Sequence, residues 1–143
     1  MTNIKFGNAD RNLVIAELEK IFSTKLKPIQ IMNSRKYLRA DDGRRYCIVG
    51  GVGNWHGIHE AIFEIESLAP SNSALIVASK LRSKIDIFLG PLDVLVLHSD
   101  QLTHTKASLF EFNLRQRGNK LVIREVPNLI LEKIGEIELD SQE

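Results

Sequence analysis

Cysteine is almost absent from this sequence: Cys47 is the single one in 143 residues, so the chain cannot form an internal disulfide. Long apolar runs are absent too. The longest, residues 74–78 and 94–97, fall far short of the roughly 18 residues that span a bilayer. Residues 1–5 lack the apolar stretch of a signal peptide. We therefore expect a cytoplasmic protein without a membrane partner or a disulfide framework.

The composition is that of one globular domain with an uneven distribution of charge. Hydrophobic residues make up 43 % of the chain and charged residues 26 %, with a formal net charge of +1. A chain of this length is expected to form a single domain over residues 1–143. An acidic tail is expected from about residue 132, where five of the six charged residues are acidic. A basic segment carries Lys25, Lys27, Arg35, Lys36, Arg39, Arg44 and Arg45.

Hydrophobic periodicity predicts an α+β domain with a curved, mostly antiparallel, pseudobarrel-like sheet and about three helices. The first helix is expected to begin at Asp10 as its N-cap. The expected helices span residues 10–22, 58–68 and 91–97, and the expected strands span residues 29–32, 35–40, 45–49, 74–78, 85–89, 109–114 and 121–126.

The sharpest local signal is Asp42-Gly43 between two strand-like runs, which predicts a hairpin with a two-residue turn. In that register Arg39 faces Tyr46 across the strands. Strand alternation then places one apolar set, including Cys47, toward the core. The opposite face would gather Arg35, Tyr37, Arg39, Arg44 and Tyr46.

That face predicts a nucleic-acid surface, because guanidinium groups fork onto phosphates and aromatic rings stack on bases. Trp55, in the following loop, is expected to be a further stacking residue. The structural alternative is an ordinary solvated strand face whose arginines pair partly with Asp41 and Asp42.

Two other patterns point less sharply to chemistry. Residues 50–57 form a glycine-rich loop, but its spacing matches neither a phosphate-binding P-loop nor a dinucleotide fingerprint. A tight bend that folds Trp55 over the core is favoured, and the sequence leaves open whether the loop binds a ligand. His56 and His59 lack a defined third ligand, so no metal site is predicted.

Two resemblances in element order bear on function. The order expected over residues 10–78, a helix, three strands, a helix and a strand, resembles the core of restriction-endonuclease-like nucleases. The resemblance implies Mg²⁺ held by an acidic residue on the second core strand and a carboxylate-x-lysine on the third. The third strand here reads Tyr46-Cys47-Ile48-Val49 and lacks that motif. The nearest equivalents are Asp41 or Asp42, with Glu60 or Glu64 from the helix and Lys36 as the base.

The order expected over residues 35–126 resembles the DNA-binding pseudobarrels of plant transcription factors and of restriction-enzyme effector domains. This resemblance implies DNA binding and transfers no individual residue. We therefore predict a small DNA-binding module that needs no cofactor, with a restriction or defence system as one setting. Two alternatives stay open: a degenerate, Mg²⁺-dependent nuclease of the restriction-endonuclease-like class, and a non-catalytic protein-interaction subunit. In the second, the basic hairpin meets an acidic partner, such as residues 132–143 of another copy in a homo-oligomer.

Overall fold

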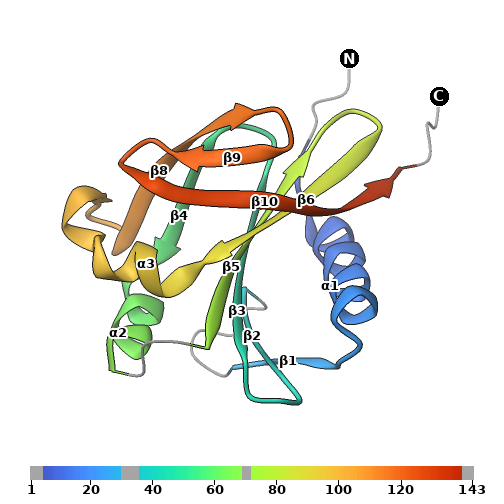
Figure 1. Cartoon of the computed structure of the whole chain (residues 1–143), viewed down its shortest axis with the longest axis horizontal. Helices are drawn as coiled ribbons and strands as arrows, with labels where there is room; N and C mark the ends of the chain where they lie inside the picture. Colours follow the sequence, from blue (N-terminus) through green and yellow to red (C-terminus); the bar gives the residue numbers. More distant parts are fainter. Residues whose placement is uncertain (1–4, 30–35, 69–71, 140–143) are drawn as a thin grey trace.

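The computed structural model describes residues 5–29, 36–68 and 72–139. Its helices are α1 (Asn8–Phe22), α2 (Glu60–Leu68), α3 (Leu92–Leu97) and the short 3₁₀ helix η1 (Ser99–Gln101). Its strands are β1 (Leu26–Pro28), β2 (Tyr37–Ala40), β3 (Arg45–Gly51), β4 (Trp55–His59), β5 (Ser73–Lys80), β6 (Lys84–Pro91), β7 (Thr103–His104), β8 (Leu109–Arg117), β9 (Lys120–Ile123) and β10 (Val126–Glu138) (Figure 1). The predicted α+β class is confirmed.

The strands form one large sheet in the order β1-β2-β3-β5-β6-β10-β9-β8-β4, with β7 paired to β8. Neighbouring strands are antiparallel except β3 and β5, which run parallel on either side of α2 in the sequence. Within the described residues the sheet does not close, so β1 and β4 are its two ends. The predicted curved and mostly antiparallel sheet is therefore confirmed, and β4 has an open edge.

Both faces of the central strands are buried. One face of β3 and β5 packs with α2, α3 and the strands β4, β8, β9 and β10 in the larger core, which includes Cys47, Leu75 and Phe112. The other face packs against α1, whose Val14 and Leu18 are fully buried (Figure 1). This double burial explains why residues 74–78 read as an unbroken apolar run rather than an alternating one.

The N-cap of the first helix lies three residues before the predicted one. Gly7 is the N-cap of α1, and Asp10 is the third helical residue, whose carboxylate accepts the Gly7 N–H at 2.9 Å. The same carboxylate pairs with Lys80 Nζ at 2.9 Å. Asp10 thus accepts the backbone N–H of the N-cap residue, as the third helical residue does in a capping box. No helix in the described part of the chain is long and apolar enough to cross a membrane.

The β2–β3 hairpin is confirmed, but its predicted register is wrong. Leu38 pairs with Tyr46, and Ala40 N–H bonds to the carbonyl of Arg44 at 2.8 Å, so the loop holds three residues rather than two. Gly43 occupies the left-handed region at φ +91°. A type I turn followed by a left-handed glycine is the common three-residue hairpin loop. The slip of one residue moves every side chain of one strand to the other face.

Three further segments differ from expectation. Residues 55–59 form β4, and α2 begins only at Glu60. The strand expected at residues 29–32 is preceded by β1 (Leu26–Pro28), and its residues 30–32 lie outside the described ones. The acidic segment from residue 132 belongs to β10 as far as Glu138.

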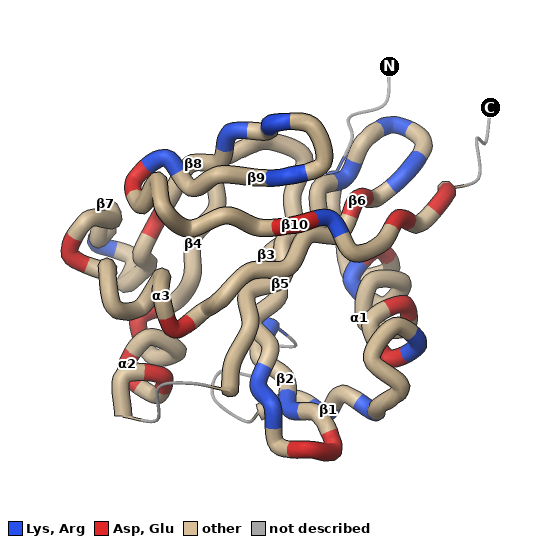
Figure 2. Tube along the Cα trace, viewed as in Figure 1, with Lys and Arg blue, Asp and Glu red and all other residues tan. Residues whose placement is uncertain are grey.

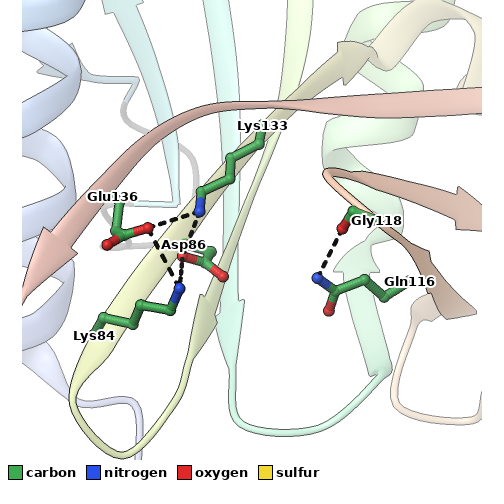
Figure 3. A network of polar contacts seen from close by, with 6 residues as sticks. All are labelled: Lys84, Asp86, Gln116, Gly118, Lys133 and Glu136. Carbon is green, nitrogen blue, oxygen red and sulfur yellow. Dashed lines mark hydrogen bonds and ion pairs between the residues drawn. The ribbon is translucent and has the colours of Figure 1, made fainter.

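A polar network fixes β10 against β6 (Figure 3). Lys133 Nζ lies 3.1 Å from Asp86 Oδ1 and 2.7 Å from Glu136 Oε1, and Lys84 Nζ lies 3.4 Å from the same Glu136 oxygen. Hydrogen bonds from Lys133 and Lys84 lower the pKa of Glu136. Glu136, an acidic residue of the predicted tail, is therefore a structural partner of two neighbouring lysines.

Candidate nucleic-acid interface

The two tyrosines of the predicted face are buried on opposite sides of the sheet. Tyr37 is 2 % exposed and pairs with Cys47, and Tyr46 is 3 % exposed and pairs with Leu38. Neither ring is accessible to a base. Arg35 lies outside the described residues. The interleaved face expected on β2 and β3 is therefore not formed by the residues that the structure describes.

Tyr37 instead belongs to a buried polar cluster at the end of α2. Its hydroxyl donates to the Glu66 carboxylate, which also accepts hydrogen bonds from Arg45 Nε at 2.6 Å and Nη2 at 3.2 Å. Burial by itself would raise the pKa of Glu66, but the bonds from Arg45 and Tyr37 outweigh it and lower that pKa. The cluster ties α2 to β2 and β3 and leaves Arg45 unsuited to contact a ligand.

Arg39 and Arg44 reach the surface, but they lie on opposite faces of the hairpin. Arg39 is exposed and pairs with Arg45, whereas Arg44 lies opposite Ala40. The Arg44 guanidinium lies 5.5 Å from the centre of the Tyr46 ring, a cation–π contact. Their predicted contacts with phosphates stay a prediction.

Trp55 is the predicted stacking residue that the structure places on a surface. Its side chain is 58 % exposed, and it pairs with Asn113 between β4 and β8. The indole Nε1 donates to Glu111 Oε1 at 2.8 Å, which holds the ring beside β8 while leaving it accessible. The predicted fold of Trp55 over the core is wrong, because strand alternation sends His56 inward and Trp55 outward.

A set of basic residues continues outward from Trp55 along β8 and β9. Arg115 pairs with Val122, and Arg117 pairs with Lys120 across the turn. The residues that alternate with them, Leu114 and Leu121, are buried, so the basic side chains point away from the core. Arg124 is also exposed and bonds through its N–H to the carbonyl of Asn113 at 2.9 Å, beside Trp55. We call this surface the β8–β9 basic face: Trp55, Arg115, Arg117, Lys120 and Arg124.

The cations of the β8–β9 basic face are not used by the fold. Among the described residues, none of the four basic side chains forms a hydrogen bond or an ion pair. Glu132 lies opposite Lys120 on β10 and limits the positive surface on that side. Figure 2 shows the basic positions distributed along β8 and β9. Charges without internal partners are available to an external anion.

Sequence reasoning identified Trp55 but missed the basic half of this face. The sequence predicts strands at residues 109–114 and 121–126, whose apolar residues favour a core role, and it assigns no function to the basic residues between them. The signal that could have revealed it is the alternation of Arg115 and Arg117 with Leu114 and Gln116, the period of a half-buried strand.

The remaining candidates separate in space. His56 and His59 are three residues apart in β4 and so face opposite ways. In the described part of the chain, no three His, Cys, Asp or Glu side chains group as metal ligands. Cys47 is 1 % exposed, and burial raises the pKa of its thiol to about 12, as expected of a core residue rather than a nucleophile.

Comparison with known proteins gives no relative: no family model, curated protein or solved structure matches this chain.

Proposed function

We propose that this chain binds single-stranded DNA through the β8–β9 basic face without cleaving it. The observation that carries the proposal is an accessible indole, Trp55, beside four cations that no described residue neutralises. Basic groups that follow a backbone, with an aromatic ring on which a base stacks, are the general means of binding single strands. In duplex DNA the bases stack on one another, so few base faces are available to stack on the Trp55 ring.

The test is a titration of fluorescein-labelled single-stranded and duplex oligonucleotides, followed by anisotropy at about 50 and 200 mM salt. We expect tighter binding of the single strand and a steep loss of affinity with salt. Replacing Arg115, Arg117 and Lys120 by alanine should weaken binding roughly tenfold or more and reduce the slope of log K against log salt by about 2, because each phosphate contact in a single strand contributes about 0.7.

The matched control removes three other cations, Lys20, Lys25 and Lys27, which belong to α1 and to the segment through β1, away from β8 and β9 (Figure 2). It should bind like the unaltered protein. An Arg39→Ala, Arg44→Ala variant tests the hairpin favoured by the sequence. If the control triple variant weakens binding as much as the β8–β9 variant, or if no oligonucleotide binds, the proposal is wrong. Products run on a denaturing gel with Mg²⁺ test the nuclease alternative, which requires cut strands.

A further inference from the structure

A pocket of about 260 Å³ lies between the unpaired edge of β4 and the end of β3 that extends beyond its pairing with β2. Beyond the β2 pairing, Ile48 N–H bonds to the carbonyl of Lys36, and Arg11 reaches the same strand from α1 to donate to the carbonyl of Ile48 at 3.1 Å. Arg11 and Lys36 therefore meet at one edge, and both line the pocket. Of the described residues that line it, none is acidic.

His56 gives the pocket an unsatisfied polar atom. The side chain is 6 % exposed and lines the pocket from β4, and in the structure its Nε2 has no hydrogen-bond partner. Buried polar atoms are nearly always bonded, and leaving one unpaired costs about 1–3 kcal/mol. Burial lowers the pKa of His56 more than a hydrogen bond to the backbone of Gly53 raises it, which favours the neutral imidazole, in which one ring nitrogen accepts a hydrogen bond. A ligand that brings a proton would satisfy it.

The size of the pocket limits what enters it. Pockets for whole drug-sized ligands measure about 300–1,000 Å³, so this one accommodates a single polar group rather than a complete nucleotide. The described residues that line the pocket include two cations and no acid, a lining that favours an anion. A phosphate monoester carries about −1.5 to −2 charges near pH 7 and exchanges its last proton at a pKa of about 6. The protonated form of the phosphate can therefore donate a hydrogen bond to His56 Nε2.

Trp55 connects this pocket to the surface already described, because it lines the pocket and also belongs to the β8–β9 basic face. We infer that the pocket holds the terminal phosphate of a single strand whose end base stacks on Trp55, with Arg11, Lys36 and His56 around the phosphate. This inference rests on the proposed function and adds a preference for strand ends. An internal phosphodiester has one charge and two ester substituents, so it should fit the pocket less well than a terminal phosphate.

The test compares three unlabelled oligonucleotides of one sequence, ending in a 5′-phosphate, a 3′-phosphate or hydroxyls alone, as competitors of an internally labelled strand. We expect one phosphorylated strand to compete about tenfold more tightly than the hydroxyl-ended strand, and the two phosphate arms identify which end enters. Lys36→Ala, at an exposed position, should abolish this advantage while leaving the fold intact. Lys27→Ala, another exposed lysine, should retain it.

A second measurement locates the phosphate. In an NMR titration with the preferred strand, the imidazole Nε2 signal of His56 should shift, and the hydroxyl-ended strand should leave it unchanged. Equal competition by the three strands overturns the terminal-phosphate site but leaves strand binding standing. A phosphate preference with an unmoved His56 signal overturns it as well, because the phosphate then binds elsewhere. Failure of every oligonucleotide to bind overturns both this site and the proposed function.

Discussion

Glu66 is the charged side chain on which the packing of α2 against β2 and β3 depends most. Its side chain is fully buried and paired with Arg45 at 2.6 Å. We expect Glu66→Gln to lower the free energy of unfolding by about 3 kcal/mol, because it leaves the partly buried Arg45 without its counter-charge. Urea denaturation measures the loss. Glu64→Gln, an exposed change in the same helix, should stay within about 0.5 kcal/mol, and equal effects of the two variants would contradict the buried pair.

The same carboxylate predicts a pH dependence of stability. Bonds from Arg45 and Tyr37 keep the pKa of Glu66 below its ordinary 4.5 in the folded protein, despite burial. Its contribution is therefore complete above that value and is lost as the pH falls through the lower folded-state pKa. Unfolding midpoints measured between about pH 6 and pH 3 should fall less steeply for Glu66→Gln than for the unaltered protein. Parallel curves would show that other groups control acid unfolding.

The β2–β3 hairpin shows how one backbone angle sets the register of an element. Gly43 adopts φ +91°, and no atom lies within 4 Å of the position that a Cβ would occupy. A side chain at this position would therefore strain the backbone without clashing with a neighbour. We expect Gly43→Ala to destabilise the protein by about 1–2 kcal/mol. Gly53→Ala is the matched control, because Gly53 has similar open space and no positive φ, and it should be neutral or slightly stabilising. Thermal unfolding of the two variants distinguishes these outcomes.

The same hairpin explains why the sequence predicted the element but not its surface. Asp-Gly marks a tight turn, yet two- and three-residue loops share that signal, and the choice reverses which residues face the core. Because both faces of β3 are buried, its sequence does not alternate between apolar and polar residues, and such an alternation would otherwise have indicated the correct register. By contrast, the strands expected at residues 109–114 and 121–126 are confirmed as β8 and β9, and Arg117 pairs with Lys120 beside the turn that joins them.

Across the whole molecule, β10 is the strand that joins the two parts of the sheet. It lies between β6 on one side and β9 on the other. Leu131 is fully buried in the larger core, whereas its neighbour Ile130 is 43 % exposed. We therefore expect Leu131→Ala to cost about 3 kcal/mol and Ile130→Ala less than about 1 kcal/mol. Similar losses in chemical denaturation would contradict the central position of β10.

The class of fold, the three helices and most strands followed from periodicity, because helices and half-buried strands repeat at different spacings. Three strands, β4, β7 and β10, did not. From about residue 132 the acidic residues predict a tail, whereas the structure continues β10 to Glu138 and pairs Glu136 with Lys133 of the same strand and with Lys84 of β6. β4 was concealed by glycines that suggest a loop. Strand order and the open edge of β4 depend on long-range pairing, which no local pattern encodes.

Trp55 allows the most direct test of single-strand binding, because it is the single tryptophan of the chain and lies on the β8–β9 basic face. Intrinsic fluorescence is measured while an unlabelled oligonucleotide is added at low and then at high salt. Single-stranded DNA should quench the emission in a saturable way that high salt reverses, with duplex DNA of the same sequence much less effective. Unchanged emission over the whole single-strand titration would contradict the proposed interface.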